Sequence, residues 1–121
     1  MERRNAALVA AGGFAGAASR HGVTLVLPAA FSFPWGTLAV NVVGSFLLGV
    51  VVYGTETRGG IPARARLVVS TGFVSSFTTY STFAAETVEL APALAAVNVA
   101  GNYALGLLAV FLARTVVRWR S

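Results

Sequence analysis

The 121-residue sequence contains no cysteine, no lysine and no aspartate, and it has one histidine and four glutamates. The absence of cysteine excludes disulfide bonds, thiol chemistry and thiolate metal sites. One histidine and four glutamates are too few for most catalytic schemes, so we expect the protein not to be an enzyme. Charged residues make up only 11% of the chain, which leaves too little polar surface for a soluble globule.

Hydrophobic residues, in contrast, make up 56% of the sequence, and the mean hydropathy is +0.75. Four apolar stretches, residues 6–27, 35–53, 67–89 and 91–113, approach the roughly 20 residues that a helix needs to cross the hydrocarbon core. They predict an all-α membrane protein with a single four-helix transmembrane domain over residues 1–121. Cleavage of the first stretch as a signal peptide is disfavoured, because it would discard most of a span.

All nine basic residues are arginine, and eight of them precede the first stretch, separate the second from the third, or follow the fourth. The two opposite connections, residues 28–34 and 86–92, contain no arginine and two glutamates. Because basic loops stay inside, this pattern predicts a multi-pass cell-membrane protein with both termini in the cytoplasm.

Residues 70–85 lie where the third membrane helix is expected, yet eight of these sixteen residues are Ser or Thr. Their hydroxyls compete with helical hydrogen bonds, and irregular backbone at membrane depth survives only where protein or a watery cavity covers it. The run therefore predicts a broken third helix that lines a polar path. Tyr80 and Phe83 place two rings on one face, with Ser81 and Thr82 displaced from it.

Three asparagines interrupt the second and fourth apolar stretches. Asn41 either joins helices or offers its amide to a passing solute. Asn98 and Asn102 are four residues apart, with Tyr103 beside them, so polar groups recur on one stripe of the fourth span.

The remaining charged candidates lie near the outer ends of the spans. Arg20 continues the face of Gly12 and Gly16, and it either snorkels to the interface or provides a cation at the mouth of an anion path. Glu86 and Glu89 are one turn apart, and they either form an interfacial pair or line a vestibule.

Paired motifs in the second and third stretches resemble those of the Fluc/CrcB family of fluoride channels. They are Gly36-Thr37-Leu38, Asn41-x-x-Gly44-Ser45-Phe46, Thr71-Gly72-Phe73 and Phe77-Thr78-Thr79-Tyr80-Ser81-Thr82-Phe83, and Gly13-x-x-Gly16-Ala17-x-x-Arg20 is similar to the family's first-helix pattern. The resemblance implies an antiparallel dimer with two pores that passively exports cytoplasmic fluoride.

Fluoride is small and strongly hydrated, so its path must replace water with several hydrogen-bond donors. Side chains of this chain that suit the task are amides, hydroxyls and polarised ring edges. We expect the fluoride path to include Asn41, Tyr80, Phe83, Ser81, Thr82, Tyr103, Arg20 and Glu86.

The resemblance also implies a structural sodium ion at the dimer interface, held by the backbone carbonyls of Ser75 and Thr78. The chain departs from the family at two places: the family usually has two glycines at the positions of Ser75-Ser76 and a phenylalanine at the position of Tyr80. The one-sided arginines should fix one orientation, at roughly 1 kcal/mol per basic residue near an anionic leaflet. Together these features favour a heterodimer with a homologous subunit of opposite orientation over the homodimer.

Two rival functions remain at this point. A small four-helix multidrug transporter should hold a membrane-embedded carboxylate in its first helix, where this chain has Arg20 and no acid. A non-conducting assembly subunit would use its Ser and Thr residues only for interhelical contacts.

Overall fold

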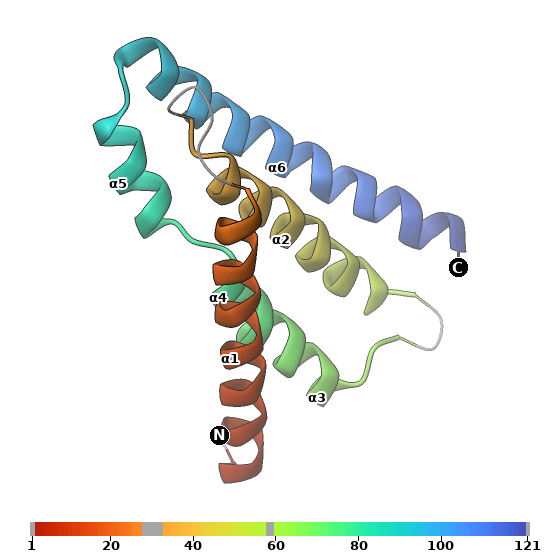
Figure 1. The fold of residues 1–121 in the computed structure, drawn as a ribbon. Coiled ribbons are helices and arrows are strands. Elements are labelled where there is room, and N and C mark those ends of the chain that lie inside the picture. The colour runs from red at the N-terminus through yellow and green to blue at the C-terminus, as the bar shows by residue number, and fades with distance from the viewer. Residues whose placement is uncertain (1, 28–32, 58–59, 121) are drawn as a thin grey trace.

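The computed structural model describes residues 2–27, 33–57 and 60–120, and the regular structure in these ranges is helical (Figure 1). The elements are α1 (Arg3–Val26), α2 (Trp35–Gly54), α3 (Ala63–Arg66), the π-helix η1 (Leu67–Val74), α4 (Ser75–Phe77), α5 (Ser81–Glu89) and α6 (Pro92–Arg120). The predicted all-helical class is confirmed. The connection at residues 28–32 and Arg58, which entered the charge argument, lie outside the described residues.

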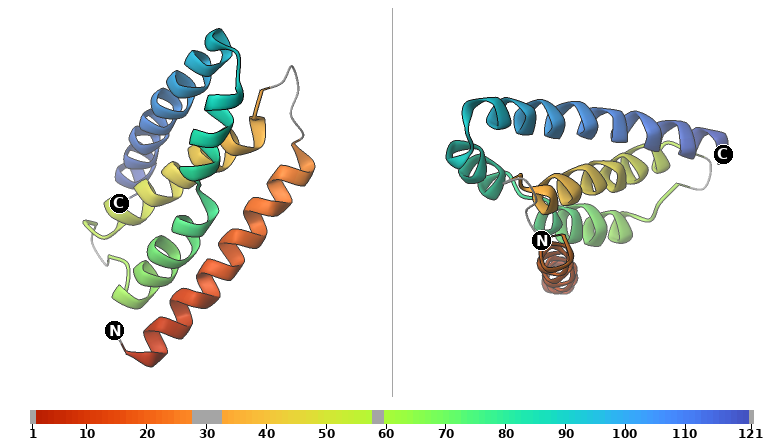
Figure 2. Two further views of the ribbon diagram at one scale, coloured as in Figure 1. Left: turned by 90° about the vertical axis from the view of Figure 1, so that its left-hand side faces the viewer. Right: turned by 45° about the horizontal axis from the view of Figure 1, so that its top comes forward.

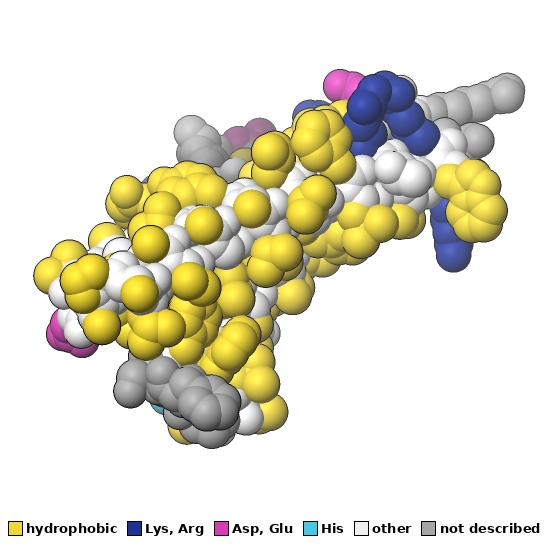
Figure 3. All heavy atoms as spheres, turned by 90° about the horizontal axis from the view of Figure 1, so that it is seen from above, with side chains coloured by type: hydrophobic (Ala, Val, Ile, Leu, Met, Phe, Trp, Pro, Cys, Tyr) yellow, Lys and Arg dark blue, Asp and Glu magenta, His cyan; other side chains and the backbone are white. Residues whose placement is uncertain are grey.

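Two of the described helices, α2 and α6, are long and apolar enough to cross a membrane, with hydropathies of 1.9 and 1.7. In α1 the polar side chains of Arg20 and His21 lower the hydropathy, and the third stretch is divided into short helices. The four-span arrangement therefore stays a prediction. Figure 3 shows the molecule from above, relative to Figure 1. Hydrophobic side chains cover the middle of this face, whereas basic side chains gather at one end.

Helix α1 packs mainly on η1, with the two backbones in close contact. A methyl group on Gly12 would lie 2.6 Å from the carbonyl oxygen of Val68, and one on Gly72 would lie 2.8 Å from that of Val9. Both distances are too short for a carbon atom, so glycine is required for this approach. The small-residue face that the sequence predicted on α1 is thus the face that contacts η1.

The second close pair is α2 with α6, which lie side by side (Figures 1 and 2). A methyl group on Gly49 would lie 2.8 Å from Cβ of Ala113, and one on Gly106 would lie 3.3 Å from Oγ of Ser45. Small residues at such contacts let membrane helices approach closely. This contact aligns Asn41 on α2 with the asparagines of α6.

The third apolar stretch is interrupted at residues 78–80, as the Ser/Thr-rich run predicted. Thr78 has an extended backbone (φ −80°, ψ 161°), so the helix ends at Phe77 and resumes at Ser81. Ser75 keeps helical angles of φ −63° and ψ −29°. Because neither Thr78 nor Ser75 adopts a left-handed conformation, the interruption does not need glycine at Ser75-Ser76.

Both termini and the connection from α2 to α3 lie toward the same end of the molecule (Figure 2, left). The connection from α5 to α6 lies at the opposite end. The arginines of α3 and of the last turn of α6 therefore share one end with the N-terminus, in agreement with the charge pattern in the sequence. The orientation of that end relative to the cytoplasm stays a prediction.

Candidate functional site

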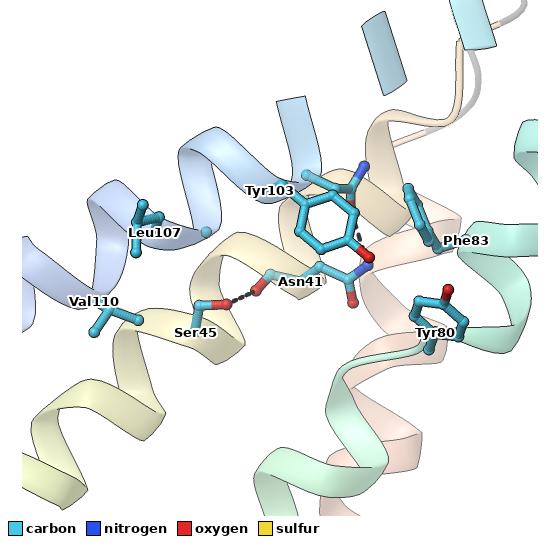
Figure 4. Close-up of a pocket in the computed structure, with 9 residues that line it drawn as sticks. Asn41, Ser45, Tyr80, Phe83, Tyr103, Leu107 and Val110 are labelled. Carbon is cyan, nitrogen blue, oxygen red and sulfur yellow. Dashed lines mark hydrogen bonds between the residues drawn. The ribbon is translucent and has the colours of Figure 1, made fainter. Parts of the chain in front are cut away.

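A pocket of about 350 Å³ is formed where α2, α6 and the start of α5 meet (Figure 4). Its polar and aromatic lining consists of Asn41, Ser45, Tyr80, Phe83, Asn102 and Tyr103, and α6 adds an apolar wall. Four of the residues predicted for the fluoride path, Asn41, Tyr80, Phe83 and Tyr103, therefore come together from three segments.

A second pocket, of about 240 Å³, also borders the interruption. It shares Asn41, Ser45 and Tyr80 with the first pocket and adds Thr78 and Thr79. Asn41 and Tyr80 thus line both cavities.

The three aromatic rings of the first pocket form a connected cluster. The ring of Phe83 is buried and lies nearly perpendicular to that of Tyr103, at 83° with centroids 6.2 Å apart. The Tyr80 ring is tilted at 53° to Phe83 at 5.7 Å. Perpendicular rings present hydrogen-bearing edges, which are the positive part of the ring quadrupole. The cluster can therefore offer positive edges without a formal charge.

Asn41 uses its side-chain amide to hold the interrupted backbone. Its Oδ1 accepts a hydrogen bond from the backbone N–H of Thr79 at 2.8 Å, and its Nδ2 donates to the carbonyl of Thr79 at 3.1 Å. The same Nδ2 donates to Oδ1 of Asn102 at 3.0 Å. Of the two roles that the sequence left open, helix joining is present, and the residue also lines the pocket.

The polar contacts continue from Asn102 along α6. Its Nδ2 donates to Oδ1 of Asn98 at 3.0 Å and to the carbonyl of Asn98 at 2.8 Å. Asn98 is fully buried and donates from Nδ2 to Oγ1 of Thr87 at 2.8 Å. The polar stripe predicted on the fourth span is therefore a link from α2 to α5.

Four other predicted residues of the fluoride path lie outside these two pockets. Ser81 and Thr82 are exposed at the start of α5, and Glu86 accepts a hydrogen bond from Thr37 at 2.5 Å. Arg20 is half-buried on α1. The roles of these residues stay predictions.

The carbonyls predicted to bind sodium are both released from helical hydrogen bonding. The N–H of Thr79, which would donate to the Ser75 carbonyl in a continuous helix, donates to Asn41 instead. The N–H of Thr82, which would donate to the Thr78 carbonyl, donates to Oγ1 of Thr79 at 3.1 Å. Uncommitted carbonyl oxygens are suitable ligands for a hard cation, so the donor set fits sodium.

The sequence did not place Thr79 or Thr87 among the site residues, and it marked Asn98 and Asn102 only as a polar stripe. Thr79 was one of many hydroxyls in its run, and nothing local marked it as the partner of Asn41. For Asn98 and Asn102, the four-residue spacing was the usable signal, and Thr87 follows Phe83 at the same spacing.

The fold and the pocket define a helical membrane protein with an interrupted helix beside a polar, aromatic-lined cavity. The family described as "CrcB-like protein, Camphor Resistance (CrcB)" matches residues 7–114. The chain belongs to this family.

Three curated relatives match over nearly the whole chain. A protein of Natronomonas pharaonis named fluoride-specific ion channel FluC 1 is 66% identical over 121 residues, covering 100% of both chains. A FluC 1 of Haloarcula marismortui is 53% identical over 92% of this chain and 84% of its own. A FluC 2 of Symbiobacterium thermophilum is 48% identical over 93% of this chain and 97% of its own.

Proposed function

We propose that the protein is a fluoride-specific ion channel that lowers cytoplasmic fluoride by letting it leave passively. The observation that carries the proposal is the pocket in which Asn41, Phe83 and Tyr103 meet, in a chain 66% identical over its full length to a named fluoride channel. An anion pore needs donors that replace hydration without trapping the ion. The hydroxyls of Tyr80 and Tyr103 and the ring edges can supply such donors, whereas the two amide groups of the lining already donate within the protein. The lining residues of this pocket include no arginine or histidine.

The proposed working unit is an antiparallel dimer with two pores, in which each chain crosses the membrane four times. Many large apolar side chains of α6 are exposed in the single subunit, among them Leu107, Leu108 and Phe111. Such a surface requires lipid or a second subunit. In the proposed dimer, the carbonyls of Ser75 and Thr78 would hold a structural sodium ion at the interface.

We favour a heterodimer with a homologous subunit of opposite orientation. The support is the one-sided arginine distribution, together with relatives whose names carry the numbers 1 and 2. Topology reporters fused to the C-terminus test this. The heterodimer predicts a single orientation, with the reporter in the cytoplasm. Equal inside and outside populations of the chain expressed alone, combined with conducting dimers, would leave the homodimer.

Release of ions from proteoliposomes, which hold the chain alone or together with a homologous subunit of opposite orientation, tests the channel function itself. Vesicles loaded with fluoride or with chloride are diluted into ion-free buffer with a potassium ionophore, and each anion is followed with its selective electrode. We expect fluoride to leave while chloride stays. A multidrug transporter or a non-conducting assembly subunit would release neither ion, and release of both would contradict fluoride specificity.

A further inference from the structure

The hydrogen bonds that begin at the interruption form one continuous chain with a single donor direction. The Thr79 N–H donates to Asn41, Asn41 to Asn102, Asn102 to Asn98, and Asn98 to Thr87. Oγ1 of Thr87 then donates to the carbonyl of Phe83 at 2.7 Å. We call the side chains of Asn41, Asn102, Asn98 and Thr87 the polar brace.

The hydrogen-bond chain begins inside the interruption and ends in the helix that follows it. Thr79 belongs to the interruption, and Phe83 lies in α5. Between them the polar brace runs through α2 and α6, so it links the interruption to α5 by a route outside the third stretch. Hydrogen bonds aligned in one direction polarise each other, which strengthens such a chain in a low-dielectric interior.

Asn98 is the most enclosed polar member of the brace, with 0% of its surface exposed. Its Oδ1 accepts from Asn102 and its Nδ2 donates to Thr87, so the amide is used on both sides. Phe83, which carries the last acceptor, points its ring into the pocket against Tyr103 (Figure 4). The contact between Asn98 and Thr87 therefore fixes the distance between α6 and the helix that holds Phe83.

We propose that Asn98 and Thr87 are positioning residues of the channel, which hold α5 against α6 and thereby set the Phe83 ring in the fluoride path. This inference rests on the proposed function. Neither residue lines the two pockets, so they act through the placement of Phe83.

The first test compares Thr87→Val with Thr87→Ser in the proteoliposome assay. Valine keeps the shape of threonine but removes the hydroxyl, whereas serine keeps the hydroxyl. We expect Thr87→Val to lower fluoride efflux about fivefold, in line with the loss of one net hydrogen bond. Thr87→Ser should restore at least half of the wild-type rate.

Thr115→Val is the matched control. Oγ1 of Thr115 donates to the carbonyl of Phe111 at 3.0 Å, the same four-residue contact as in Thr87, but outside the brace. We expect its efflux to equal that of the wild type. The positioning role is overturned if Thr87→Val conducts normally, if Thr87→Ser is equally impaired, or if Thr115→Val loses the same activity.

Hydrogen exchange of the purified protein in detergent provides a readout that does not require conduction. Thr87→Val should increase amide exchange in α5 while α1 exchanges as in the wild type. The double variant Thr87→Val/Asn98→Leu removes both partners, and Asn102 keeps the backbone carbonyl of Asn98 as its acceptor. It should fold, show the same fast exchange in α5, and conduct no better than Thr87→Val alone.

The two readouts separate the brace from the proposed function. If the unmodified protein releases no fluoride, either alone or reconstituted with a homologous subunit of opposite orientation, the channel function fails, and the positioning role for fluoride fails with it. Unchanged α5 exchange in Thr87→Val and in the double variant would overturn the brace whatever the conduction result.

Discussion

Replacing Asn41 with aspartate keeps one of the three hydrogen bonds of its side chain and removes the donor from the other two. Oδ1 can still accept from the N–H of Thr79, which now lies at 2.8 Å. The second carboxylate oxygen would replace Nδ2 and face two acceptors, the carbonyl of Thr79 and Oδ1 of Asn102, which now lie at 3.1 and 3.0 Å. A buried acceptor without its donor costs about 1–3 kcal/mol, so the folded subunit loses about 2–6 kcal/mol.

The added negative charge has a larger effect on conduction. Two like unit charges about 4 Å apart repel by about 4 kcal/mol at an effective dielectric constant near 20. Each 1.36 kcal/mol added to a barrier slows the rate tenfold, so fluoride efflux should fall by about three orders of magnitude.

The assay is fluoride efflux from proteoliposomes at equal amounts of folded protein, verified by gel filtration in detergent. Asn5→Asp on α1 is the matched control, because it makes the same chemical change away from both pockets, at a side chain whose Oδ1 is buried without a hydrogen-bond partner, and so it also controls for the cost of a buried carboxylate. We expect it to conduct like the wild type. A wild-type rate in Asn41→Asp would refute the assignment of Asn41 to the fluoride path.

Phe83→Ile removes the ring that lies edge-on to Tyr103, so fluoride efflux should fall about fivefold, the rate equivalent of about 1 kcal/mol of aromatic contact. Normal efflux in this variant would exclude a role for the ring edge. Arg20→Gln should lower fluoride efflux most at low ionic strength, where a cation best concentrates anions. Normal conduction of this variant, combined with poorer membrane insertion, would show that Arg20 is a snorkelling side chain. Gly72→Ala places a methyl group 2.8 Å from the Val9 carbonyl and should destabilise the fold by about 1–3 kcal/mol, measured as a lower unfolding midpoint. The methyl group of the control Gly22→Ala meets no atom within 4 Å, and equal midpoints for the two variants would contradict the close packing of α1 on η1.

The sequence was informative wherever a local pattern determined the structure. The apolar stretches set the long helices, the spacing of Gly12 and Gly16 marked the packed face of α1, and the hydroxyl-rich run located the interruption. The helix α2 covers Trp35–Gly54, nearly the same residues as the apolar stretch 35–53. In each case the signal lies within a few turns of one helix, where spacing determines which face a residue occupies.

What the sequence did not predict depends on contacts between distant segments. The pairing of Asn41 with Thr79 spans 38 residues, and the pairing with Asn102 spans 61. Nothing near Asn41 indicates which backbone group its amide meets. The sequence also did not show where the bend occurs: it lies at Thr78, in an extended conformation open to any residue, and Ser75 keeps helical angles.

The interruption has a consequence for the order of events during membrane insertion. The N–H and the carbonyl of Thr79 are paired with Asn41, a residue on another helix, and an isolated third segment in lipid would lack that partner. Because unpaired backbone groups are not tolerated in hydrocarbon, the segment alone would close its own hydrogen bonds and form one uninterrupted helix. The chain would then open at Thr78–Tyr80 only when α2 docks beside it. The cavities beside Asn41 and Tyr80 would form at that step and not before.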